Sequence, residues 1–72
     1  MIKCAFSYPD CEHEGDIKAG EDIVAEALSK CGSQGKILET RWSGEDGDDC
    51  HIIFSVEENL KEKVRNTCYD LM

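Results

Sequence analysis

The amino-acid sequence predicts an α+β fold, a single two-layer domain in which two helices cover one face of a three-stranded antiparallel sheet. Three segments have the pattern of strands, in which apolar residues alternate with polar ones or cluster, and two other segments have apolar residues at helical spacing. Along the chain their order is strand, helix, strand, strand, helix. The chain, residues 1–72, is long enough for one domain and too short for a second. A hydrophobic share of 40% is typical of a folded domain.

The first half of the chain is expected to contain one strand and one helix. Apolar residues alternate over 2–8, which is the period of a half-buried strand, and Pro9 ends the pattern. An acidic connection, 10–20, follows, and it is long for a domain of this size. The helix is expected from about Gly20 to Cys31, because its apolar residues share one helical face.

The second half is expected to begin with a β-hairpin. Its first strand covers 36–43, where Leu38 and Trp42 are the stronger candidates for the inward face. Its second strand, 51–56, is the most apolar segment of the chain, and the acidic turn 44–49 joins the two.

The last helix is expected to begin at a capping box, with Ser55 as the capping residue and Glu58 three residues later. A right-handed crossover makes the first two strands parallel, and the apolar third strand lies between them, so the strand order is 1-3-2. This order leaves the outer edge of strand 2–8 unpaired. We therefore expect a homo- or hetero-oligomer that associates through this edge or through the C-terminal helix.

The charge of the chain excludes direct binding to nucleic acid by this protein alone. Its 16 acidic and 8 basic residues give a net charge of −8, whereas contacts to phosphates need clustered Lys and Arg. The sequence has no apolar run that could cross a membrane and no signal peptide, so a cytoplasmic protein is expected. In that compartment the five cysteines are expected to be reduced.

Both histidines of the chain stand beside cysteines, as Cys11 with His13 and Cys50 with His51. The predicted topology places these two pairs near each other, and two thiolates with two imidazoles suit tetrahedral zinc. The four residues are therefore candidate zinc ligands, and Cys11 with Cys50 is a candidate redox pair. Chance adjacency stays an alternative, because the spacing is unusual for zinc and adjacent strand residues point to opposite faces. The other three cysteines fit apolar faces and are expected in the core: Cys4, Cys31 and Cys68.

No motif in the sequence predicts catalysis. A cysteine beside a histidine could provide a nucleophile and a general base, but the sequence shows neither a group that would orient the histidine nor an oxyanion site. We therefore expect a small non-catalytic interaction module. Two alternatives stay open, a zinc or thiol protein and an acidic protein that binds a basic partner.

The strand that ends in Phe-Ser-Val-Glu-Glu58 and the helix after it resemble the small dimer-forming subunit family of the KEOPS complex. In that family a Phe-Ser-Ala-Glu-Asp-like segment precedes a helix with a Leu-Arg pair and an Asn-Ser-Phe/Tyr segment. Here Leu60-Lys61 comes early for that pair, and the helix stops soon after Tyr69. The resemblance implies a dimeric scaffold, without catalytic activity, in the machinery that makes threonylcarbamoyladenosine on tRNA. The positions that match the family pattern are Phe54, Ser55, Glu57, Glu58, Arg65, Asn66 and Tyr69, and all of them except Ser55 are candidate partner-binding residues. Phe54 equally fits the core, and the two glutamates equally fit a first helical turn.

Overall fold

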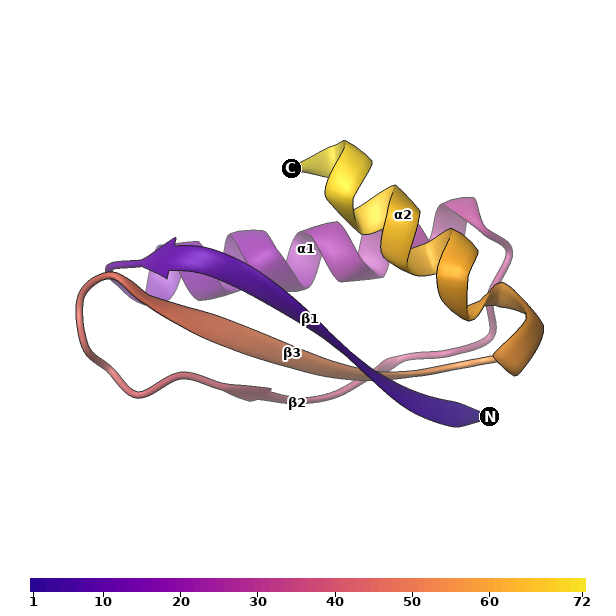
Figure 1. Cartoon of the computed structure of the whole chain (residues 1–72), viewed down its shortest axis with the longest axis horizontal. Coiled ribbons are helices and arrows are strands. Elements are labelled where there is room, and N and C mark those ends of the chain that lie inside the picture. Colours follow the sequence, from indigo (N-terminus) through magenta and orange to yellow (C-terminus); the bar gives the residue numbers. More distant parts are fainter.

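The computed structural model describes residues 1–72 and shows the predicted order of elements. They are β1 (Ile2–Cys11), α1 (Glu14–Lys30), β2 (Ile37–Arg41), β3 (Asp48–Val56), the short 3-10 helix η1 (Glu58–Leu60) and α2 (Lys61–Leu71). The strands form one antiparallel sheet in the order β1-β3-β2, and both helices lie on the same side of it (Figure 1). The predicted fold class and strand order are confirmed. Neither helix has the length and apolar character needed to span a bilayer.

The prediction of a long acidic connection at 10–20 is wrong, because β1 and α1 both extend into this segment. β1 continues through Pro9 to Cys11, and only residues 12 and 13 separate it from α1. Proline is tolerated here because β1 is an edge strand, and the register with β3 shifts at this point. α1 begins at an unusual cap, in which the side chain of His13 accepts a hydrogen bond from the backbone N–H of Gly15 at 3.0 Å.

α1 approaches the sheet closely at Gly20, a buried glycine. A Cβ atom at this position would lie 2.9 Å from Cδ1 of Ile52 and 3.1 Å from Cβ of Tyr8. On the same side of α1, Glu21 accepts a hydrogen bond of 2.6 Å from the hydroxyl of Thr40 in β2. The helix therefore touches all three strands and holds the sheet together across its width.

The inward pair predicted for the first hairpin strand is half right. Trp42 packs against the core, but Leu38 is 42% exposed, and Ile37 takes the inward position in its place. The cause is an irregularity in the pairing of β2 with β3 between Ile37 and Glu39, which changes the face to which the side chains point.

The predicted capping box at Ser55 is wrong. Ser55 lies within β3, where its hydroxyl accepts a hydrogen bond of 3.0 Å from the backbone N–H of Lys36 and its own N–H donates to the Lys36 carbonyl at 2.8 Å. The C-terminal helical segment begins instead with η1, and α2 continues from Lys61. The backbones of Gly35 and Ser55 approach so closely that a Cβ atom at Gly35 would lie 1.8 Å from the Ser55 carbonyl oxygen.

The core lies between the sheet and the two helices. The inward residues of β3 occupy every second position and are completely buried, as are Val64 and Cys68 of α2. The twelve buried residues of the core are Cys4, Phe6, Cys11, Val24, Ala27, Leu28, Cys50, Ile52, Phe54, Val56, Val64 and Cys68. The opposite face of the sheet has no layer over it, which leaves it open for contact with another molecule (Figure 1).

Candidate functional site

The outer edge of β1 carries unpaired backbone groups. The bond from Ser55 N–H to the Lys36 carbonyl shows that the backbone polar groups of Ser55 point toward β2. Because these directions alternate along a strand, the groups of the residues at even positions of β3 point toward β1. Their partners in β1 are the residues at even positions, from Ile2 to Tyr8. The N–H and C=O groups of Lys3, Ala5 and Ser7 therefore point away from the sheet, at its open edge.

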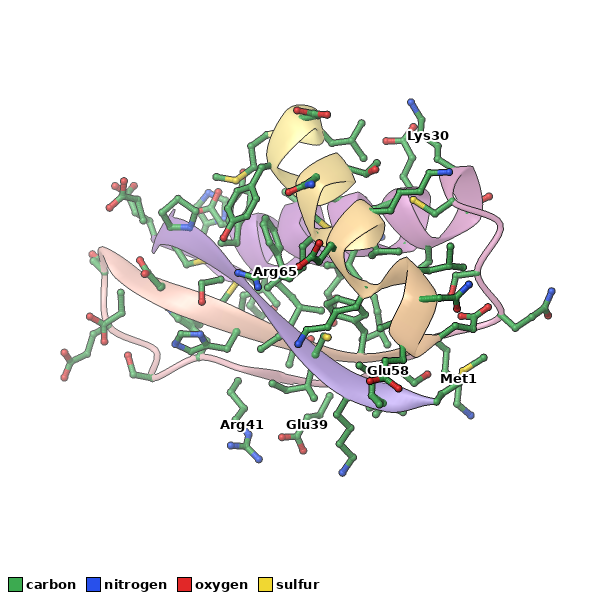
Figure 2. All side chains as sticks on the ribbon, turned by 45° about the vertical axis from the view of Figure 1, so that its right-hand side comes forward. Met1, Lys30, Glu39, Arg41, Glu58 and Arg65 are labelled. Carbon is green, nitrogen blue, oxygen red and sulfur yellow. The ribbon has the colours of Figure 1, made fainter.

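The side chains of these edge residues are exposed, and because Cys4 and Phe6 between them point into the core, they lie on the side of the sheet away from the helices. On that side the Ser7 hydroxyl and Nδ1 of His51 form a hydrogen bond of 2.8 Å across β1 and β3. Figure 2 shows Arg41 and Glu39, which form an ion pair, projecting from the sheet on the side opposite the helices. The open face is thus polar and carries charges of both signs.

A shallow hollow on α2 lies beside β1. It has a volume of about 250 Å³ and is lined by Glu62, Arg65, Asn66 and Tyr69. Tyr69 is 54% exposed, and its ring packs edge-on against that of Phe6 in β1, with 5.6 Å between the ring centroids. The structure thereby brings together three of the candidate partner-binding residues, namely Arg65, Asn66 and Tyr69.

The other candidate partner-binding residues lie elsewhere. Phe54 is completely buried in the core, so it has a structural role, as does Ser55, which matches the family pattern and joins two strands. Glu57 accepts hydrogen bonds from the Ser33 hydroxyl at 2.6 Å and from the backbone N–H of Gln34 at 3.1 Å. These bonds, the one from Ser33 first, lower the pKa of Glu57 below its ordinary value. Glu58 is exposed at the start of η1 and does not line the hollow on α2.

Of the four candidate zinc ligands, the structure brings the two cysteines together. Cys11 and Cys50 are both completely buried at the end of the β1–β3 pairing, and the Cys11 thiol donates a hydrogen bond of 3.5 Å to the Tyr8 carbonyl. Burial raises the pKa of Cys50 to about 12, and the neighbouring Cys11 thiol adds to the shift. Because neither thiol has exposed surface, solutes cannot reach either of them while this part of the fold is closed.

The two histidines point away from this thiol pair. The side chain of His13 is 71% exposed and caps α1, with its Nε2 atom 3.8 Å from the Asp16 carboxylate. His51 follows Cys50 in β3 and therefore points to the opposite face, where it bonds to Ser7. No three side chains of the types His, Cys, Asp and Glu are grouped so that they could hold a metal ion.

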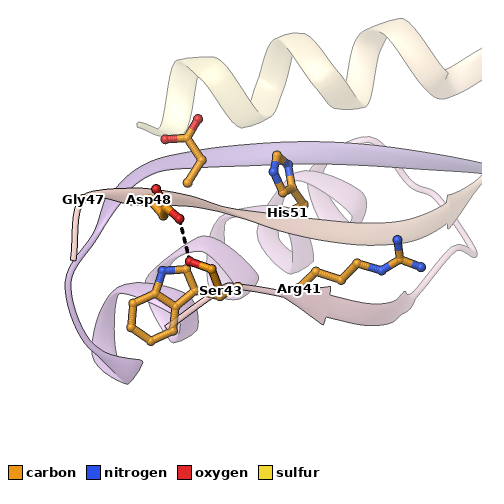
Figure 3. A pocket seen from close by; sticks show the side chains of 7 residues that line it. Arg41, Ser43, Gly47, Asp48 and His51 are labelled. Atoms are coloured by element: carbon orange, nitrogen blue, oxygen red, sulfur yellow. Dashed lines mark hydrogen bonds between the residues drawn. The ribbon is translucent and has the colours of Figure 1, made fainter. Parts of the chain in front are cut away.

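The hairpin opens into a cleft where the pairing of β2 with β3 ends, at Arg41 and His51 (Figure 3). The cleft has a volume of about 560 Å³ and is lined by Arg41, Trp42, Ser43, Gly47, Asp48, Asp49 and His51. The Ser43 hydroxyl donates a hydrogen bond of 2.6 Å to Asp48, and the buried Nε1 of Trp42 has no partner. Donors and acceptors both face this space, which suits a polar group. The sequence carries no signal for the cleft, because its position depends on where the hairpin pairing stops.

Half of the acidic residues lie at one end of the molecule. The N–H of Gly47 donates a hydrogen bond of 3.0 Å to the Cys11 carbonyl, which joins the hairpin turn to the end of β1 near the start of α1 (Figure 1). We call this region the acidic end and define it by Asp10, Glu12, Glu14, Asp16, Glu45, Asp46, Asp48 and Asp49. No Lys or Arg lies within 10–16 or 44–50 to neutralise it. The pKa of Asp16 is lowered, chiefly by a hydrogen bond from the backbone N–H of Glu12.

No protein-family model, no curated protein and no solved structure matches this chain.

Proposed function

We propose that this protein is a non-catalytic interaction module that forms a homodimer by antiparallel pairing of two β1 edges. The observation that carries the proposal is the row of unpaired backbone groups at Lys3, Ala5 and Ser7. An open edge of this kind is a template for another strand. A chain of 72 residues also has a thin core, and oligomerisation is one common way in which small domains gain stability.

A two-fold axis at Ala5 suits this edge. It places Ala5 opposite Ala5 of the second copy and Lys3 opposite Ser7 of the second copy, so the two lysines do not face each other. Each of the three opposed pairs exchanges two hydrogen bonds, which gives about six across the junction. The product is a continuous six-stranded sheet with its helices on one face.

A scaffold subunit of a cytoplasmic tRNA-modifying complex is the more specific form of this proposal. The resemblance of the β3 end and α2 to the KEOPS dimer-forming subunit favours it, and the hollow at Arg65, Asn66 and Tyr69 offers a place beside the dimer junction for a larger catalytic partner. Because the chain carries a net charge of −8, that partner would supply the basic surface for tRNA.

The test is the molar mass in solution, measured by light scattering during gel filtration at micromolar concentration. The wild-type chain is expected to be a dimer. Ala5→Pro removes the central N–H and is expected to give a monomer, whereas Ala5→Thr keeps the N–H and suits a strand, so it stays dimeric. Circular dichroism checks that both variants are folded. A monomeric wild-type chain, or a folded Ala5→Pro variant that is still dimeric, would contradict the proposal.

A second candidate function is binding of a basic partner at the acidic end. The hydrogen bond between Gly47 and Cys11 favours it, since it brings two acidic segments of the chain onto one surface. A lysine-rich peptide is expected to bind there at low salt, with affinity that falls steeply as the salt concentration rises. Binding that does not depend on salt, or that survives reversal of charge at Glu45 and Asp46, would count against this candidate.

A further inference from the structure

A second pair of neighbouring cysteines joins the two helices. Cys31 follows the last residue of α1, where it is partly buried, and its sulfur lies 3.5 Å from the hydroxyl oxygen of Thr67 in α2. The residue after Thr67 is Cys68, which points into the core and is completely buried. The thiol at the end of α1 therefore lies against the turn of α2 that carries the second thiol.

The two thiols differ in their access to solvent. Burial raises the pKa of Cys68 to about 11, and the nearby Cys31 adds to the shift, so Cys68 stays protonated at neutral pH. Cys31 is open to small solutes, because part of its surface is exposed. An accessible cysteine beside a buried resolving cysteine is the arrangement found in proteins whose thiols react reversibly with peroxides.

We propose that Cys31 and Cys68 form a dithiol that a hydroperoxide oxidises to a disulfide between α1 and α2. The Cys31 thiolate attacks the peroxide, so that an S–O bond forms, the O–O bond breaks and a sulfenic acid results. The Cys68 thiol loses its proton to the hydroxide or alkoxide released and attacks the Cys31 sulfur. An S–S bond forms, the S–O bond breaks and hydroxide leaves as water once protonated. In sum, the two thiols lose two electrons and two protons, and the hydroperoxide is reduced to water and an alcohol or, for hydrogen peroxide, to water alone.

The other cysteines do not share this arrangement. Cys11 and Cys50 are neighbours, but both have no exposed surface, and Cys4 is also buried. A peroxide reaches them only when the edge of the sheet opens. Oxidation of the folded chain is therefore expected to begin at Cys31 and to end at Cys68.

The test is peptide mapping of the reduced, full-length chain after treatment with hydrogen peroxide under native conditions and alkylation of the remaining thiols. Trypsin cuts after Lys and Arg, so Cys31 and Cys68 lie in two different peptides, neither of which contains another cysteine. We expect peptide 31–36 to be linked to 66–72, and the free thiols to fall from five to three. A link between 4–18 and 42–61, a bond between two chains, or Cys31 oxidised without a disulfide would overturn the proposal.

Variants separate the two chemical steps. In Cys68→Ser the sulfenic acid on Cys31 has no resolving thiol, and dimedone is expected to label it, whereas the wild-type chain is labelled much less. Cys31→Ser is expected to form no disulfide. The matched control is Cys11→Ser, which is expected to form the same link between 31–36 and 66–72 as the wild-type chain. Equal dimedone labelling of wild type and Cys68→Ser would show that Cys68 does not resolve the sulfenic acid and would overturn the proposal.

Discussion

Replacement of Gly35 by alanine is expected to force the start of β2 away from β3. The new Cβ atom would lie 1.8 Å from the carbonyl oxygen of Ser55, and that oxygen belongs to the backbone of the central strand, so a side-chain rotation cannot relieve the clash. The movement breaks the two short bonds between Lys36 and Ser55, which have lengths of 2.8 and 3.0 Å.

The expected loss of stability follows from these contacts. Two hydrogen bonds contribute about 1 kcal/mol each. Overpacking adds about 1–3 kcal/mol, and the smaller entropy of the unfolded alanine chain offsets about 0.4–1 kcal/mol. The net decrease in the free energy of unfolding is about 2–5 kcal/mol. At ~0.05–0.15 kcal/mol per residue, this is a large part of the stability of so small a domain.

The assay is unfolding in urea at neutral pH, followed by the fluorescence of Trp42, the one tryptophan of the chain. The matched control is Gly32→Ala. Gly32 differs from Gly35 in having a φ of +70° and no atom within 4 Å of its would-be Cβ, so this variant loses only about 1 kcal/mol, for the left-handed backbone alone. If Gly35→Ala is no less stable than Gly32→Ala, the close approach of the two backbones is not as described, and the reasoning fails.

Two further predictions concern the residues that match the family pattern. Phe54→Ala is expected to lower the free energy of unfolding by about 3–5 kcal/mol, because its ring is fully buried. Tyr69→Ala is expected to lower it much less, because its ring is half-exposed. Thermal unfolding compares the two variants, and equal losses of stability would contradict the assignment of Phe54 to the core and of Tyr69 to the surface. Glu57→Gln is expected to destabilise the fold at neutral pH. Because folding lowers the pKa of Glu57, its stabilising effect is present above the ordinary glutamate pKa of about 4.3 and is lost as the pH falls below it, so the difference between the two proteins should shrink with acid. A difference in melting temperature that does not change with pH would exclude this role.

The sequence predicts the sheet well because one strand dominates its pattern. The strand predicted at 51–56 is the most apolar of the chain and carries Ile52, Phe54 and Val56 on its buried face, and a strand so apolar is stable only between two others. The early start of α1 had no comparable signal, since its first turns contain only one large apolar residue, Ile17, and histidine is an uncommon cap. The local sequence of the first turns of α1 therefore favoured a loop, whereas in the folded chain tertiary packing extends the helix through these residues.

The candidate sites depend on features that a one-dimensional pattern does not record. The open edge of β1 follows from strand order and was predicted, but which backbone groups are free depends on one bond, from Ser55 to Lys36. Ser55 and Glu58 match the capping pattern, yet the hydroxyl of Ser55 bonds to the backbone N–H of Lys36, next to β2, and not to the N–H groups of a helix. The contact of Cys31 with Thr67 requires the packing of α1 on α2, which sequence spacing does not reveal.

The position of the acidic end makes a last prediction about the proposed dimer. Cys11, where the acidic end meets β1, lies six residues from Ala5, a distance of about 20 Å along a strand that rises ~3.3 Å per residue. In the two-fold antiparallel pair the two acidic ends point in opposite directions and lie about 40 Å apart, which is about five Debye lengths at physiological ionic strength. Dimerisation of a chain with a net charge of −8 is therefore expected to change little with salt, less than about threefold in Kd between 50 and 500 mM NaCl, as sedimentation equilibrium can measure. A dimer that strengthens steeply with salt would place the acidic ends side by side, and that result would rule out the antiparallel junction at Ala5.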